Sequence, residues 1–164
     1  MEQKDKSKKP TTTFLIKFEA SVMEREAILN STLVGISFNR ERRIEWVNDK
    51  YVEMTGFSRA ELMGSSSRMF YDSEIEYVAD GESTMRALQE SGTYVDERLI
   101  KRRNGEPFWV VLSGRCVVDR NPDAGVIWTM LDITERRQAE EDIRVALQRQ
   151  TELNELRSRF VSMT

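Results

Sequence analysis

The sequence predicts an α+β domain built on an antiparallel sheet and followed by a long charged helix. Two short strand-like runs come first, several short helices follow, and three further strand-like runs come after them. Strands grouped on either side of a helical insert favour an antiparallel sheet over alternating βαβ units. From residue 134 onward the chain contains no Gly or Pro and is dense in charge, which indicates a separate helical element.

The composition limits both the size and the chemistry of the protein. Its 164 residues, 39% hydrophobic and 32% charged, fit one compact domain with a solvated appendage. A formal charge of −3 argues against a nucleic-acid binder. The chain has no histidine, which excludes His-ligated haem and Ser-His or Cys-His nucleophiles. One cysteine, Cys116, excludes an internal disulfide and a cysteine-based zinc site.

No apolar run approaches the roughly 18 residues of a transmembrane helix. We therefore expect a cytoplasmic protein with reduced Cys116 and no membrane contact within these residues. Because no flanking group lowers its pKa, Cys116 is interpreted as a buried structural thiol.

The N-terminal part predicts a leader, a helix and a hairpin. Residues 1–13 are lysine-rich and are predicted to be a flexible leader. Residues 14–31 are predicted to form a loosely amphipathic flanking helix, although their first apolar residues could be extended instead. Apolar runs at 34–38 and 44–47 surround a polar connection, which is typical of a β-hairpin.

Capping residues mark the helices that follow. Asn48 can begin a short helix that Gly56 ends, and Ser58 with Glu61 forms a capping box for the next helix. A longer helix is expected to start at Asp72 or Ser73 and to end at Gly92. Its predicted apolar face consists of Ile75, Val78, Met85 and Leu88.

The second half of the domain is strand-like. Residues 93–101 alternate in polarity, residues 102–105 form a turn, and residues 108–118 form a long strand. A turn over 119–125 and a last apolar strand over 126–131 complete the predicted sheet.

Residues 134–164 predict a long helix with a narrow apolar stripe. Such a stripe is typical of a coiled coil, and we favour a paired helix over a solvated single helix that packs back on the domain. The register is imperfect around Gln150, and Thr134 is expected to be the N-cap. The residues expected at the dimer contact are Ile143, Ala146, Leu153, Leu156 and Phe160.

Two sets of motifs resemble a known family. The segments Gly35-Ile36, Ile44-Glu-Trp-Val-Asn48 and Thr55-Gly-Phe-Ser-Arg-Ala-Glu-Leu-Met-Gly64 resemble the N-terminal half of a PAS sensor domain. The segments Lys101-Arg-Arg-Asn-Gly-Glu-Pro-Phe-Trp-Val110 and Asp132-Ile-Thr134 resemble its C-terminal PAC half. The resemblance places this domain at 32–133 and implies a five-stranded antiparallel sheet with short helices on one face and a small internal pocket.

The end of the sequence resembles a second module. Leu153-Asn-Glu-Leu-Arg-Ser-Arg-Phe160 is similar to the start of the dimerisation helix of bacterial sensor histidine kinases, in which a phosphoacceptor histidine follows. The 164 residues are therefore expected not to be an enzyme themselves, whereas the parent protein is expected to be a histidine kinase. The segment 134–164 would be a coiled-coil linker into that dimerisation helix.

The pocket implied by the resemblance is expected to be apolar. Strand alternation and the resemblance together direct six side chains towards it: Ile36, Phe38, Ile100, Val110, Leu112 and Met130. Met69 is the seventh pocket candidate, because methionine fills irregular gaps and would make the pocket adaptable. These residues would either simply fill the core or line a small site for an apolar molecule. PAS domains carry haem, flavin, small metabolites or nothing, so the fold leaves the ligand open.

Flavin of the photoreceptor LOV subgroup is not expected. The residue at the flavin-bonding cysteine position is Ser67, and the later strands present Ile100, Val110, Leu112 and Met130 where polar flavin contacts would lie. Arg68 matches that subgroup but is interpreted as a surface ion-pair partner.

The predicted function is a sensory and dimerisation module of a two-component histidine kinase. The resemblance implies that Asp132 and Thr134 form the junction at which strain in the sheet moves a parallel coiled coil. Expected partners are a second copy of the chain, the downstream kinase domains and a response regulator, with no nucleic acid. The alternative is a ligand-free PAS module that serves only protein interaction or dimerisation. An independent enzyme lacks support, because no acid/base pair, phosphate loop or metal cluster stands out.

Overall fold

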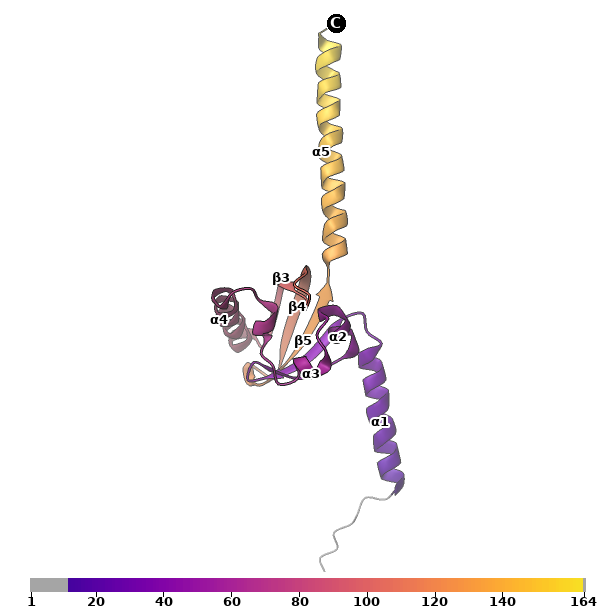
Figure 1. Cartoon of the computed structure of the whole chain (residues 1–164), viewed down its shortest axis with the longest axis vertical. Helices are drawn as coiled ribbons and strands as arrows, with labels where there is room; N and C mark the ends of the chain where they lie inside the picture. Colours follow the sequence, from indigo (N-terminus) through magenta and orange to yellow (C-terminus); the bar gives the residue numbers. More distant parts are fainter. Residues whose placement is uncertain (1–11, 164) are drawn as a thin grey trace, which may run out of the picture.

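A computed structural model describes residues 12–163 (Figure 1). Its centre is one five-stranded antiparallel sheet with the strand order β2-β1-β5-β4-β3. The strands are β1 (Gly35–Arg40), β2 (Arg43–Val47), β3 (Thr93–Lys101), β4 (Pro107–Val118) and β5 (Asn121–Asp132). The predicted α+β class and the five-stranded antiparallel sheet are confirmed.

Helices cover one face of this sheet. They are α2 (Asp49–Thr55), α3 (Arg59–Leu62), the 3-10 helix η1 (Ser67–Phe70) and α4 (Glu74–Ser91). Two longer helices, α1 (Thr12–Asn30) and α5 (Thr134–Ser162), extend from the domain in opposite directions (Figure 1). The helix α1 begins two residues earlier than predicted, and residues 1–11 of the predicted leader lie outside the described residues. Within residues 12–163, no helix has the length and apolar content needed to span a bilayer.

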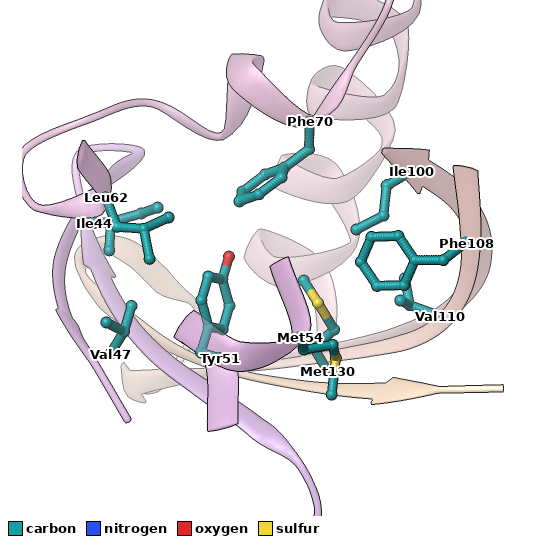
Figure 2. Packing of buried hydrophobic residues seen from close by; sticks show 10 residues of the cluster. All are labelled: Ile44, Val47, Tyr51, Met54, Leu62, Phe70, Ile100, Phe108, Val110 and Met130. Atoms are coloured by element: carbon teal, nitrogen blue, oxygen red, sulfur yellow. The ribbon is translucent and has the colours of Figure 1, made fainter. Parts of the chain in front are cut away.

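The core lies between the sheet and the short helices. Figure 2 shows Tyr51 of α2 and Phe70 of η1 pointing towards one another, with Met54 of α2 beside Phe108 and Met130 of the sheet, and all five are at most 5% exposed. The rings of Tyr51 and Phe70 meet edge to face with their centroids 6.2 Å apart. These contacts fix η1 and α2 over the sheet, which sets the walls of the space described below.

The capping residues predicted for α2 and α3 operate as expected. Oδ1 of Asn48 accepts a hydrogen bond from Tyr51 N at 3.0 Å, and Ser58 with Glu61 completes the capping box. Asn48 does more than cap α2, because its Nδ2 also donates to Leu29 O at the end of α1 and to Val34 O. This fully buried amide therefore joins α1, the approach to β1 and the start of α2.

Two of the three hairpin connections, β1–β2 and β4–β5, are tighter than the sequence predicts. The β1–β2 turn consists of Glu41 and Arg42 alone, with φ of 49° and 62°, the left-handed geometry that suits a two-residue hairpin. The expected turn over 119–125 is wrong, because β5 already begins at Asn121. An irregularity opposite Cys116 and Val118 lets the strand accommodate Pro122 within the turn-like sequence.

The predicted apolar face of α4 is partly wrong. Leu88 is fully buried, but Ile75 is 82% exposed and Val78 is also exposed. Met85 packs beside Leu88 as predicted, and the helix also directs Tyr77, Gly81 and Thr84 towards the cavity. Its inward face is therefore more polar than its sequence suggests, because it borders an internal cavity rather than a uniformly apolar core.

Candidate functional site

A cavity of about 100 Å³ lies between the inner face of the sheet and the helices α2, η1 and α4. Four of the seven predicted pocket residues line it: Ile100 of β3, Val110 and Leu112 of β4, and Met130 of β5. They form an apolar floor across β5, β4 and β3, which are neighbours in the sheet. Their role in binding a ligand stays a prediction.

The other three predicted pocket residues lie elsewhere. Ile36 and Phe38 do not line the cavity; Ser37 and Asn39 of β1 do. The pairing with β5 explains this, because residues opposite each other in an antiparallel pair share a face, and Ser37 is opposite the cavity residue Trp128. Met69 packs against the core from η1 without reaching the cavity.

A buried arginine forms the polar side of the cavity. Arg98 of β3 is only 9% exposed and donates from Nη1 to the hydroxyl of Tyr71 at 2.6 Å. Its Nη2 donates to the hydroxyl of Tyr94 at 2.5 Å and to Asp96 Oδ2 at 3.0 Å. Asp80 of α4 pairs with Nη1 at 3.3 Å. The sequence carried a signal for this position, because Arg98 has the same strand parity as the inward-facing Ile100.

The neighbours of Arg98 keep it charged. Burial lowers the pKa of Arg98, but Tyr71, Tyr94 and Asp80 outweigh burial and hold that pKa above its ordinary value. Burial is also the main reason why the pKa of the Tyr71 hydroxyl is raised. The cavity therefore borders a permanent cation that two carboxylates balance.

Arg42 borders the cavity from the hairpin turn. Its guanidinium lies over the ring of Tyr77, with Cζ 4.5 Å from the ring centroid, and both residues line the cavity. The hydroxyl of Tyr77 is in turn 2.8 Å from Ser66 Oγ, next to η1. The turn, α4 and the segment before η1 thus meet through these polar contacts on this side of the cavity.

The junction between β5 and α5 uses Thr134 differently from the prediction. Thr134 is the first residue of α5, not its N-cap, and no side chain caps the helix at Ile133. The Thr134 hydroxyl oxygen accepts a hydrogen bond from Trp109 N of β4 at 3.0 Å, and Thr134 N donates to Asp132 Oδ1 at 2.9 Å. The hydroxyl therefore ties the start of α5 to the neighbouring strand.

Asp132 connects this junction to the helical side of the domain. Its Oδ2 accepts from Arg102 Nη2 at 2.6 Å, and Arg102 also donates to Met54 O of α2. The Arg102 guanidinium lies 3.9 Å from the centroid of the buried Phe108 ring. Partial burial raises the pKa of Asp132, but hydrogen bonds from Thr134 and Arg102 outweigh burial and lower it overall.

The first turns of α5 also contact the outer face of the sheet. Arg137 pairs with Glu97 of β3 at 2.6 Å and lies 3.8 Å above the Trp109 ring, while Arg136 pairs with Glu97 at 3.1 Å. The hydrogen bond from Arg137 is the main reason why the pKa of Glu97 is lowered. The start of α5 is thus fixed to β3, β4 and β5 together.

Beyond these turns α5 extends away from the sheet (Figure 1). Its 29 residues correspond to roughly 44 Å of helix. All five predicted coil residues are exposed: Ile143, Ala146, Leu153, Leu156 and Phe160. The four large ones are at least 60% exposed.

The remaining predicted features have ordinary structural roles. Arg68 pairs with Glu74 at 2.6 Å, which confirms its interpretation as an ion-pair partner. Cys116 is buried, and burial is the main cause of its raised pKa, in agreement with a structural thiol. Within residues 12–163, no group of three or more Asp, Glu or Cys side chains is arranged to hold a metal ion.

Comparison with known proteins identifies the family that has this architecture. The family model for a PAS domain matches residues 31–135. The chain is similar to the sensor protein TdiS of Thauera aromatica, with 29% identity over 124 residues, 76% of this chain and 23% of TdiS. It is also similar to sporulation kinase C of Bacillus subtilis, with 32% identity over 107 residues, 64% of this chain and 24% of that kinase. The chain thus spans about a quarter of each of these relatives.

A solved structure shares the same fold. It is the PAS domain of a transcriptional regulator in the LuxR family from Burkholderia thailandensis, in complex with ethanol. The match has a TM-score of 0.62 and 31% identity, and it covers 66% of this chain and 96% of the other.

Proposed function

Because the chain belongs to the PAS domain family, we propose that it is the sensory module of a histidine kinase and that cavity occupancy controls α5. The observation that carries this proposal is a set of contacts from α2, whose Tyr51 lines the cavity, to the first turn of α5. Met54 of α2 lies in the core beside the cavity, Arg102 bonds its carbonyl oxygen, and Asp132 links Arg102 to Thr134. The kinases and sensors among its relatives support the sensory role.

The signal would be a shift between two arrangements of the junction. A ligand changes such an equilibrium only as far as it binds one arrangement more tightly than the other. A small molecule that pushes α2 away from the sheet would alter the position of Met54 O and therefore that of Arg102. The pair between Arg102 and Asp132 would then transfer the displacement to the start of α5.

The output would pass through a parallel homodimeric coiled coil. The exposed stripe on α5 supports this part, because isolated helices gain little stability without a partner. The coil would lead into the kinase domains of the parent protein, which would in turn serve a response regulator. The module would lie in the cytoplasm, where the buried thiol of Cys116 stays reduced.

The cavity ligand in this proposal is a small uncharged molecule rather than haem or flavin. The size of the cavity supports it, since an engineered cavity of about 150 Å³ holds benzene and the present one measures about 100 Å³. The complex of the Burkholderia relative with ethanol is in keeping with a ligand of this size. A ligand-free dimerisation module is the competing function, and the exposed stripe on α5 favours it equally.

A cavity-filling substitution separates the two functions. Leu112→Phe enlarges a side chain that lines the cavity, whereas Val95→Phe adds the same ring type to an exposed position of β3. In the parent kinase, a sensory cavity predicts that Leu112→Phe changes the basal autophosphorylation rate several-fold and that Val95→Phe does not. Equal rates in both folded variants and the unchanged protein would leave dimerisation as the function.

A further inference from the structure

Three buried polar atoms around the cavity lack a hydrogen-bond partner anywhere in the stretch 12–163. They are Asn39 Oδ1, Thr84 Oγ1 and Arg98 Nε. Thr84 is 8% and Arg98 is 9% exposed, and all three residues line the cavity. Buried polar atoms are almost always paired in folded proteins, because an unpaired one keeps its full desolvation cost. These three atoms belong to residues around one small space, and they are the groups that a molecule bound there would have to satisfy.

The three atoms define what that molecule must offer. Asn39 Oδ1 only accepts a hydrogen bond, Arg98 Nε only donates one, and the Thr84 hydroxyl does both. A hydrocarbon would leave all three unpaired. A ketone could satisfy Arg98 but not Asn39, because it has no hydrogen to donate.

Charge around the cavity selects a neutral molecule. Arg42, Arg98 and Asp80 line the cavity, and Asp96 pairs with Arg98 beside it, so these four charges sum to zero. An anion would lie near Asp80 and a cation near Arg42 and Arg98, so either would add an uncompensated charge to a mostly buried space. The opposite side of the cavity is the apolar floor of Ile100, Val110, Leu112 and Met130.

We infer that the cavity binds a small neutral molecule that both donates and accepts hydrogen bonds, such as a short-chain amide or alcohol. Its polar end would lie against Asn39, Thr84 and Arg98 and its carbon chain against the apolar floor. This inference rests on the proposed sensory function and names the class of ligand. The inferred ligand is therefore not purely apolar, because the cavity also recognises its polar end.

Four probes of equal non-hydrogen atom count test the class of ligand. Propionamide donates and accepts, 2-butanone only accepts, propionate is an anion, and cyclopentane has no polar group. We expect amide shifts of cavity residues in ¹H-¹⁵N NMR titrations, with propionamide binding about tenfold more tightly than 2-butanone, the scale of one hydrogen bond. Tighter binding of propionate, 2-butanone or cyclopentane would overturn the inference.

Isosteric variants test the polar residues themselves. Thr84→Val and Asn39→Leu remove the unpaired atoms with little change in shape, and Thr129→Val makes the same change on β5 outside the cavity. We expect the first two to weaken propionamide binding about tenfold without lowering the melting temperature, since they remove unpaired buried atoms. Thr129→Val should bind as the unchanged protein does.

The outcomes are separable from those of the proposed function. If no probe shifts the cavity resonances, water alone satisfies the three atoms and the inference is wrong. If Thr84→Val and Asn39→Leu bind propionamide normally, the polar end lies elsewhere and the inference is equally wrong. The Leu112→Phe experiment on the parent kinase uses no ligand, so a sensory response there stands whatever the probes show.

Discussion

Gly81 of α4 lies directly against the guanidinium of Arg42 in the hairpin turn. A Cβ atom built at position 81 would lie 3.0 Å from Arg42 Cζ and closer still to Nη2. Glycine inside a helix is unfavourable by about 1 kcal/mol relative to alanine. Its presence in the middle of α4 is explained by this close approach, which lets Arg42 pack over Tyr77 beside the cavity.

Gly81→Ala should therefore be less stabilising in the presence of Arg42 than in its absence. In an Arg42→Ala background, we expect Gly81→Ala to stabilise the domain by about 0.5–1 kcal/mol through helix propensity. In the unchanged background the displaced guanidinium should cancel that gain. Urea unfolding of the four proteins of this double-mutant cycle gives the coupling directly. Identical effects of Gly81→Ala in both backgrounds would show that the contact carries no energy.

Asp132→Ala should uncouple the sheet from α5 while the core stays folded. The variant removes the acceptor for Thr134 N and the partner of Arg102, whereas Asp132→Asn removes mainly the charge. In the parent kinase we expect altered basal activity and a weaker response for Asp132→Ala, with nearly unchanged far-ultraviolet dichroism. The effect of Asp132→Asn should be smaller. An unaltered signal response in Asp132→Ala would remove this residue from the route.

The contribution of Asp132 to stability should depend on pH. Because its pKa is lower in the folded state than its unfolded value of about 3.9, the charged form stabilises the fold. That stabilisation is fully present above pH 4 or so and is lost as the pH falls through the folded pKa. The difference in unfolding free energy between the unchanged protein and Asp132→Asn should be constant from pH 7 to 5 and should shrink near pH 3. A difference that is independent of pH down to 3 would contradict the assignment.

Thr134→Val should destabilise the junction through β4 rather than through a lost helix cap. Valine cannot accept the hydrogen bond from Trp109 N, so a partly buried N–H loses its partner at a cost of about 1–3 kcal/mol. Thr134→Ser keeps the oxygen and should be nearly neutral. Hydrogen exchange at Trp109 should be faster in the valine variant alone. Fraying confined to α5, with Trp109 still protected, would restore the capping interpretation.

Charges placed on the α5 stripe should abolish the homodimer. Leu153→Glu with Leu156→Glu introduces two negative charges into the expected contact, which should give monomers with a folded core. Gln148→Glu with Ser158→Glu adds the same charge on other faces of the helix and should leave the dimer intact. Light scattering at tens of micromolar measures both. A dimer that survives the first pair would place the interface elsewhere.

Local chemistry in the sequence was sufficient for most of the fold. Capping residues such as Asn48 and Ser58 marked the helix starts, because a cap satisfies amides within the same short segment. Apolar runs and alternating polarity indicated five strands, and the resemblance to PAS domains implied that they form one antiparallel sheet, which the family match supports. The β1–β2 and β4–β5 turns were harder to predict, because their length depends on the register across the sheet rather than on the turn residues.

The candidate site was predicted only in its apolar part. Ile100, Val110, Leu112 and Met130 could be assigned to one face by strand alternation. The face of β1 could not, since both of its faces are partly covered and only its pairing with β5 directs Ser37 inward. Arg98 was missed because a charged residue is expected at the surface, although its parity matched that of Ile100.

The sequence by itself determined the elements, their order, the family and the absence of histidine chemistry, because these depend on residue types and short-range spacing. Only the tertiary structure decided where side chains from distant segments meet. The Thr134 hydroxyl accepts a hydrogen bond from Trp109 N of β4, and Tyr71, Tyr94 and Asp80 bind the buried Arg98. Apart from Tyr94, which is four positions from Arg98, these partners lie in distant segments, so no local pattern in the chain records them.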